Sequence, residues 1–212
     1  MTLAPSEPSP DPRWTGVLLV GGVSLRMGQD KLRMRLPDGA LLAERPAIAL
    51  ARTCATLLAA HRRDQAAFVP DGFEAVTDAE PGGGPLGGIV AALAVSRTPW
   101  ILVVGGDMPD LRPDFLRGFM DLAERDPRRA LVLGRGRRLE PMPIAIPLRC
   151  EAEVQQRFLC GERAVRRAVP ADRLRVVDSF ELEPGAGVRP WLSLNTPEDW
   201  REYTGAEAAV RA

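Results

Sequence analysis

The chain has 212 residues, with 28 basic and 28 acidic side chains and a formal net charge of zero. A neutral chain has no overall attraction to nucleic acid or to an anionic membrane, so any anion site must be built locally. No run of residues approaches the roughly 20 apolar positions of a membrane helix. Three cysteines, Cys54, Cys150 and Cys160, lack the spacing of a metal site. These features predict reduced thiols and a cytoplasmic protein with neither a nucleic-acid nor a membrane partner.

Hydrophobic runs and turn residues predict the elements of the first half of the chain. In chain order we expect a strand at Thr15–Val20, a hairpin at Leu32–Leu42, a helix at Glu44–Ala60, strands at Ala66–Val69 and Glu74–Thr77, a helix at Leu86–Ser96, a strand at Trp100–Val104 and a helix at Asp114–Glu124. Strands that alternate with helices indicate a mostly parallel sheet covered on both faces.

The second half continues with shorter elements. We expect strands at Ala130–Leu133 and Met142–Ile146, helices at Cys150–Leu159 and Glu162–Val169, strands at Leu174–Val177 and Trp191–Leu194, and a last helix from Pro197. The predicted fold is a single α/β domain, a three-layer αβα sandwich, over residues 14–205. Proline-rich residues 1–13 are expected to be a disordered lead-in, and residues 206–212 a C-terminal tail.

A glycine-rich loop follows the first predicted strand and ends at Lys31. Glycines at Gly21, Gly22 and Gly28 allow tight turns whose backbone N–H groups can surround an anion. The loop also carries a hydroxyl, Ser24, and two cations, Arg26 and Lys31. Lys31 is the single lysine among 28 basic residues, which indicates a position that needs a compact ammonium. The loop matches neither the Walker A pattern nor the dinucleotide fingerprint, and it is typical of a triphosphate site.

The loop resembles a family signature. Residues 19–31 match the pattern L-x-G-G-x-S-x-R-M-G-x-D-K of the molybdenum cofactor guanylyltransferase (MobA) family, whose fold is Rossmann-like. The resemblance implies transfer of GMP from GTP to the phosphate of Mo-molybdopterin, with release of pyrophosphate. It also assigns GTP and Mo-molybdopterin as partners, together with possible enzymes of cofactor biosynthesis or cofactor acceptance. The loop residues implied in nucleotide binding are Leu19, Val20, Gly21, Gly22, Ser24, Arg26, Gly28 and Lys31.

Later segments resemble other motifs of the same family. Residues 78–88 resemble its D-x-x-P-G-x-G-P-L-x-G loop, which implies nucleotide contacts by Asp78, Pro85, Leu86 and Gly88. The alternative is a helix N-terminal loop whose glycines only permit packing. Asp107 lies in a D-x-P motif after the second buried strand, which implies a Mg²⁺ ligand. Its alternative role is to cap the turn before the next helix.

The last motif is Asn195-Thr196-Pro197-Glu198-Asp199. Here Asn195 could line the substrate site, whereas Thr196 could simply cap the final helix with Pro197 at its first position. The proposed catalytic residues are Lys31, Arg26 and Asp107.

Two departures from the family pattern leave alternatives open. Val20 stands where the family usually has alanine, and residues 66–71 lack an asparagine often found there in members that bind guanine nucleotides. A CTP-dependent molybdopterin cytidylyltransferase, or a related transferase with another phosphate acceptor, therefore remains an alternative. A nucleotide-binding paralogue without catalysis is the non-enzyme alternative.

Overall fold

A computed structural model describes residues 8–21, 31–63, 69–78, 80, 82–135, 138–182 and 189–210. Its centre is a seven-stranded sheet with the order β3-β2-β1-β4-β6-β5-β7. Neighbouring strands are parallel except that β6 runs antiparallel to both β4 and β5. The strands are β1 (Asp11–Leu19), β2 (Cys54–His61), β3 (Glu74–Thr77), β4 (Trp100–Gly105), β5 (Ala130–Arg135), β6 (Arg138–Pro147) and β7 (Leu174–Asp178).

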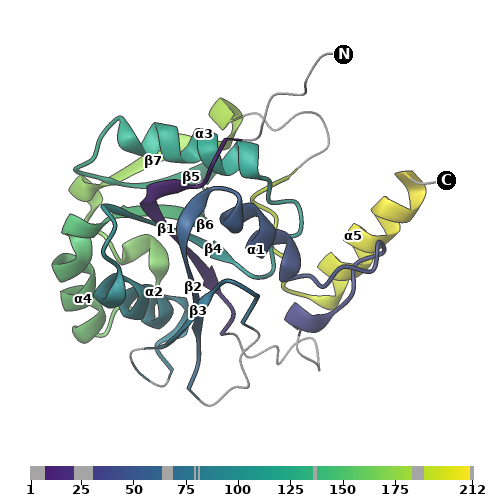
Figure 1. Ribbon diagram of the computed structural model, residues 1–212, viewed down its shortest axis with the longest axis horizontal. Helices are drawn as coiled ribbons and strands as arrows, with labels where there is room; N and C mark the ends of the chain where they lie inside the picture. The colour runs from purple at the N-terminus through teal and green to yellow at the C-terminus, as the bar shows by residue number, and fades with distance from the viewer. Residues whose placement is uncertain are drawn as a thin grey trace.

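Helices cover both faces of this sheet (Figure 1). They are α1 (Glu44–Ala51), α2 (Gly84–Val95), α3 (Pro113–Glu124) and α4 (Glu151–Leu159), and a further helix, α5 (Pro197–Val210), follows them in the chain. Helix α1 packs beside α3, and α2 packs beside α4. The crossovers β1-α1-β2 and β3-α2-β4 run in opposite directions along the sheet, so right-handed connections put α1 and α2 on opposite faces. The predicted mostly parallel αβα sandwich is confirmed.

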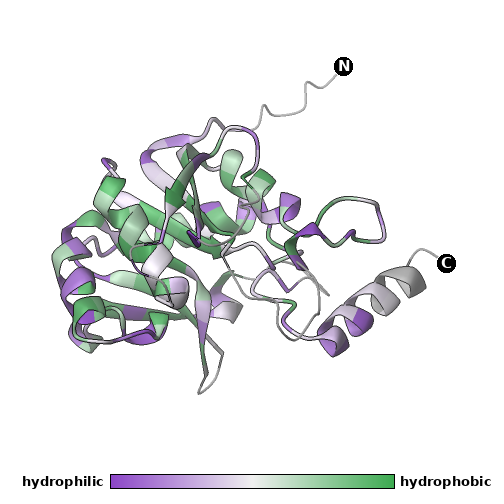
Figure 2. Cartoon of the chain, turned by 90° about the horizontal axis from the view of Figure 1, so that it is seen from below, coloured by the Kyte–Doolittle hydropathy of each residue, from purple (hydrophilic) through white to green (hydrophobic). Residues whose placement is uncertain are grey.

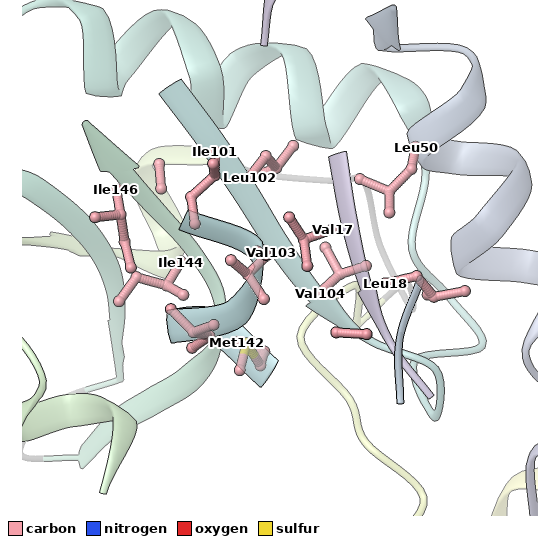
Figure 3. Close-up of a cluster of buried hydrophobic side chains, with 14 of the residues drawn as sticks. Val17, Leu18, Leu50, Ile101, Leu102, Val103, Val104, Met142, Ile144 and Ile146 are labelled. Atoms are coloured by element: carbon pink, nitrogen blue, oxygen red, sulfur yellow. The ribbon is translucent and has the colours of Figure 1, made fainter. Parts of the chain in front are cut away.

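The core is built from apolar strands buried on both faces. Val17 and Leu18 of β1 and all of Ile101–Val104 of β4 are fully buried. Figure 3 shows these side chains beside Ile144 and Ile146 of β6, with Leu50 of α1 approaching from the helical layer. Such continuous apolar runs are typical of central strands in parallel sheets. Figure 2 shows the strands of the sheet as largely hydrophobic.

The predicted helix at Glu44–Ala60 is wrong in its second half. Helix α1 ends at Ala51, and Cys54–His61 forms β2, which pairs with β1 on one side and β3 on the other. The alanine- and leucine-rich sequence has a helical preference, but pairing on both edges and burial of Leu58, Ala59 and Ala60 outweigh it. Strand β2 fills the sheet position next to β1.

Several other predicted elements differ from the structure. Residues 66–68 of the strand expected at Ala66–Val69 lie outside the described residues, and Val69 itself is not in a strand. The expected hairpin is reduced to a 3₁₀ turn, η1 (Lys31–Arg33), and one antiparallel bridge between Arg35 and Leu41. Residues 191–194 form turns and irregular backbone, and only Val165–Arg167 of the expected helix at 162–169 is helical, as a 3₁₀ turn. Further 3₁₀ turns are Leu148–Cys150, Ala171–Arg173 and Ser179–Leu182.

Both ends of the described chain differ from expectation as well. Strand β1 begins at Asp11, inside the expected lead-in, because Asp11 pairs with Cys54 of β2. Helix α5 continues to Val210, beyond the expected domain end at residue 205.

A second, smaller core supports α5, which stands away from the sheet (Figure 1). It consists of buried Leu36, Leu42, Leu194 and Tyr203, with Leu192 and Trp200 packed against them. This cluster joins three segments, namely residues 31–42, the stretch before α5, and α5 itself. Asn195 directly follows Leu194 of this cluster, whereas Lys31 precedes Leu32, which belongs to the main core.

Candidate functional site

The site lies at the point in the sheet where the strand order changes direction. Strand β1 is flanked by β2 and β4, and the chain proceeds outward from β1 to one side first and then to the other. Crevices beyond the carboxyl ends of strands at such a point are the usual ligand sites of doubly wound sheets. The end of β1 is anchored on both sides. The N–H of Gly106 donates to the carbonyl of Leu19 at 3.0 Å, and the N–H of Val20 donates to the carbonyl of Ala60 at 2.9 Å.

Lys31 and Asp107 meet directly at this edge. The Lys31 ammonium lies 2.7 Å from Oδ2 of Asp107, and their side chains are only 15% and 16% exposed. The same ammonium donates to Oδ1 of Asn195 at 3.0 Å and to the carbonyl of Leu194 at 3.2 Å. Three predicted site residues that are up to 164 positions apart in the sequence are thus brought together.

Two glycines, the last residue of β4 and the residue after it, allow Asp107 to take this position. A Cβ atom on Gly105 would lie 2.6 Å from Oδ1 of Asp107, a distance that side chains do not tolerate. A Cβ atom on Gly106 would lie 3.0 Å from Leu32 and 3.2 Å from the carbonyl oxygen of Leu19. The pair of glycines therefore lets the carboxylate fold back over the strand end while the turn packs against β1.

The motif around Asn195 caps α5 and also contacts Lys31. Thr196 and Asp199 form a reciprocal cap, in which Oγ1 of Thr196 accepts the N–H of Asp199 at 3.1 Å and Oδ2 of Asp199 accepts the N–H of Thr196 at 2.8 Å. This bears out the structural alternative for Thr196. Asn195 additionally bonds Lys31, and the N–H of Leu194 donates to the carbonyl of Asp107 at 3.0 Å. The cap of α5 therefore also holds the site.

Asp199 is the strongest acceptor in this cap. Its Oδ2 also accepts the N–H of Asn195 at 2.9 Å. Partial burial raises the pKa of Asp199, but the backbone N–H donors of Asn195 and Thr196 outweigh burial, with Lys31 adding attraction, and the net pKa is lowered. Asp199 is therefore a charged cap at neutral pH.

Asp78 and α2 lie on the other side of the end of β1. The N–H of Asp78 donates to the carbonyl of His61 at 2.8 Å. A Cβ atom on Gly88 would lie 3.1 Å from Leu19, 3.2 Å from Ala60 and 3.2 Å from Oδ1 of Asp78. At Gly88, α2 therefore packs closely against the ends of β1 and β2, as the packing alternative for this loop requires, and Asp78 lies at the same point.

The remaining predicted residues divide into three groups. Pro85 is exposed at the start of α2, whereas the Leu86 side chain is fully buried in the core, so Leu86 can offer a ligand only its backbone. Val20 is likewise buried, at 5% exposure. Gly22, Ser24, Arg26 and Gly28 lie outside the described residues.

The oxygen atoms around Lys31 fit a hard divalent cation by their chemistry. A carboxylate, an amide oxygen and a backbone carbonyl converge on one positive charge, and these are the ligands that Mg²⁺ and similar ions prefer. Across the described ranges, no group of three or more histidine, cysteine, aspartate or glutamate side chains is placed to hold a metal. The fit therefore depends on Asp107 as the single charged ligand.

Sequence reasoning missed two contributors to this arrangement. The carbonyl of Leu194 carries no sequence signal because every residue has one. Asp199 stands in the last motif without an expected role, although its place three residues after Thr196 is the spacing of a capping box. That spacing could have identified Asp199 as the residue that orients the backbone of Asn195.

Comparisons with known proteins identify a matching domain family and long alignments to relatives. The MobA-like NTP transferase domain matches residues 16–186. A probable molybdenum cofactor guanylyltransferase of Opitutus terrae is 35% identical over 197 residues, covering 87% of this chain and 91% of its own length.

Solved structures share the fold. Molybdopterin-guanine dinucleotide biosynthesis protein A of Archaeoglobus fulgidus has a TM-score of 0.75 at 21% identity, covering 92% of this chain and 99% of its own. A Mycobacterium tuberculosis protein in complex with manganese has a TM-score of 0.58 at 21% identity, covering 92% of this chain and 98% of its own. No helix within the described residues has the length and apolar character to cross a membrane. The domain match and the long alignment to the Opitutus protein place the chain in the MobA-like NTP transferase family, a family of nucleotidyltransferases.

Proposed function

We propose that this protein transfers GMP from GTP to the phosphate of Mo-molybdopterin and releases pyrophosphate. The observation that carries the proposal is the meeting of Lys31 and Asp107 at the carboxyl ends of β1 and β4. Lys31 stands at the end of the glycine-rich loop, and Asp107 follows β4. Relatives of this chain bear the name molybdenum cofactor guanylyltransferase, which supports the choice of GTP and of the acceptor.

The chemistry needs positioning more than proton transfer. The acceptor phosphate is already an anion at neutral pH, so its oxygen can attack the α-phosphorus without a strong general base, and pyrophosphate leaves in line. Lys31 neutralises charge on the triphosphate and on the departing pyrophosphate, and we assign Arg26 to the same task. The backbone N–H groups of Gly21, Gly22 and Gly28 and the hydroxyl of Ser24 orient the phosphates.

A divalent cation, which we propose to be Mg²⁺, would be held by Asp107 with the amide oxygen of Asn195 beside it. When bound, it supplies charge neutralisation at the phosphates. Asp78 and the start of α2, through Pro85, the Leu86 backbone and Gly88, form the side that takes the nucleoside, with Leu19 and Val20 as its floor. We place the protein in the cytoplasm, in keeping with three cysteines that form no disulfide.

The first experiment is a thermal-shift panel with GTP, CTP, ATP and UTP, each with and without Mg²⁺. A ligand that binds only the native state at a hundred times its Kd adds about 2.7 kcal/mol of stability. We expect the large shift with GTP and Mg²⁺ together, and none of that size with Asp107→Ala. A shift selective for CTP would support cytidylyl transfer in place of guanylyl transfer. The absence of any shift would contradict the proposed nucleotide site.

Product analysis then tests the acceptor. The protein is incubated with α-labelled GTP, Mg²⁺ and molybdopterin, and the label is followed into a dinucleotide. Label that stays in GTP, with GTP binding intact, would point to a different phosphate acceptor.

A further inference from the structure

The Lys31 ammonium occupies a cage of oxygens. An ammonium carries three N–H donors, and Lys31 has three oxygen acceptors at 2.7, 3.0 and 3.2 Å, from Asp107, Asn195 and Leu194. Hydrogen bonds of their own backbone hold two of these acceptor residues in place. Leu194 is hydrogen-bonded to the backbone of Asp107, and the Asn195 backbone is held by Asp199. The cage is therefore a built feature with little freedom to open.

The same oxygens are those that the divalent cation of the proposed reaction needs. A divalent cation on Asp107 and an ammonium 2.7 Å from the same carboxylate would repel each other at contact distance. Both side chains are about 85% shielded from water, so solvent and salt screen this repulsion only weakly. Lys31 and the metal therefore compete for the cage.

We propose that Lys31 is a placeholder cation that occupies the position of the metal until a nucleotide arrives. Lys31 directly follows the glycine-rich loop, and its flexible four-carbon stem allows the ammonium to leave Asp107 for a phosphate. A bound triphosphate offers Lys31 a second anion, which frees Asp107 for the metal. Metal and nucleotide therefore strengthen each other's binding, and by linkage the effect is equal in both directions. This inference rests on the proposed function for the identity of the ligands.

Calorimetric titration with Mg²⁺ alone measures the competition. We expect Lys31→Met to bind Mg²⁺ at least about tenfold more tightly than the unaltered protein in the absence of nucleotide, because the cage is then vacant. Arg33→Met is the matched control. It removes one positive charge from the same 3₁₀ turn, at an exposed position, and should change Mg²⁺ affinity less than about twofold. Equal Mg²⁺ affinity of Lys31→Met and the unaltered protein, or an equal gain in Arg33→Met, would overturn the placeholder.

The single lysine gives a second readout on the unaltered chain. Protein labelled with ¹³Cε,¹⁵Nζ-lysine has one side-chain lysine signal in its NMR spectrum. We expect Asp107→Asn to move this signal, millimolar Mg²⁺ alone to leave it in place, and Mg²⁺ with a GTP analogue carrying an α,β-methylene bridge to move it to a new position. A signal that ignores Asp107→Asn, or that stays in place with both ligands bound, would contradict the proposal.

The two proposals fail in different ways. If GTP binds and reacts while Lys31→Met leaves Mg²⁺ affinity unchanged, the placeholder is wrong and guanylyl transfer stands. If another nucleotide binds in place of GTP, guanylyl transfer is wrong, and the same titrations with the methylene analogue of that nucleotide still decide the role of Lys31.

Discussion

The ammonium of Lys31 reaches a carboxylate, an amide and a backbone carbonyl from one compact head group. A guanidinium at the same position would direct its donors outward in a plane and could not converge on these three oxygens. The chain uses arginine at every other basic position, so a preference for lysine here reflects geometry and not composition.

We predict that Lys31→Arg lowers kcat/KM for nucleotidyl transfer by at least about tenfold although the formal charge is unchanged, because a planar guanidinium then replaces the compact ammonium that we assign to the triphosphate. Steady-state kinetics with GTP would measure this loss, and thermal unfolding would check that the fold is retained. Arg125→Lys, at the exposed C-terminal end of α3, is the matched control and should leave kcat/KM unchanged. An active Lys31→Arg enzyme would mean that charge alone is sufficient at this position.

The three cysteines differ in how deeply they are buried. Burial raises the pKa of the Cys54 thiol to about 12, and it raises the pKa of Cys150 as well, whereas Cys160 is exposed at the end of α4. Because the thiolate is the reactive form, we predict that a chromogenic disulfide reagent at pH 8 modifies one thiol in the folded protein and three in guanidinium. Cys160→Ser should abolish the fast reaction. Rapid modification of two or more native thiols would contradict the buried placement of Cys54 and Cys150.

Among the elements, α5 links stability to the site through its N-terminal cap. Asp199 accepts the N–H groups of both Asn195 and Thr196, so loss of its carboxylate leaves two backbone donors without this partner. We predict that Asp199→Ala lowers the free energy of unfolding at pH 7 by about 1–2 kcal/mol, as measured by urea denaturation. Glu198→Ala, an exposed change in the same turn, is the control and should cost less than about 0.5 kcal/mol.

The pH dependence of this difference has a definite sign. The pKa of Asp199 is lowered in the folded state, so its charged form contributes stability above the unfolded value of 3.8 and loses that contribution as the pH falls through the folded pKa. The gap between the unaltered protein and Asp199→Ala should therefore be constant from pH 7 to pH 5 and shrink below pH 4. A gap that widened on acidification would contradict a charged cap.

The strands and helices differ in how accurately the sequence predicts their type and bounds. Apolar runs between turn residues predicted β1, β4, α2 and α3 to within a few residues, because burial on both faces or on one helical stripe leaves a clear pattern. Strand β2 could not be predicted this way, since Cys54–His61 has a helical composition and becomes a strand only through its two parallel neighbours. Motif residues Lys31, Asp107 and Asn195 were found from their patterns. Their convergence through Leu194 and Asp199 needed the fold, because backbone partners leave no trace in a sequence.

The whole molecule consists of a sheet core and the smaller core under α5, and the site lies at their junction. The two parts meet at the Leu194–Asp107 backbone hydrogen bond and at a 2.8 Å hydrogen bond from the Tyr203 hydroxyl to Asp110. Lys31 and Asp107 lie next to Leu32 and Met108 of the sheet core, whereas Asn195 follows Leu194 of the smaller core. The geometry of the site therefore depends on how firmly the smaller core is packed.

Leu42 tests this dependence because its side chain is fully buried in the smaller core. We predict that Leu42→Ala costs about 2–4 kcal/mol locally, since it leaves a cavity between residues 31–42 and α5. Hydrogen exchange should then accelerate in α5 and around Leu36, while β1 and β4 keep their protection. Affinity for the nucleotide should fall as well, because the fraction of molecules with Lys31 and Asn195 in place decreases.

Ile48→Ala is the control for this change, because Ile48 is 52% exposed on α1 and its loss should alter neither exchange nor affinity. If Leu42→Ala accelerated exchange equally in the sheet and in α5, the two cores would open as one unit. If exchange in α5 rose while nucleotide affinity stayed constant, the smaller core would support α5 without positioning the site. Only local opening together with weaker nucleotide binding is expected when the packing of one core sets the geometry of the junction.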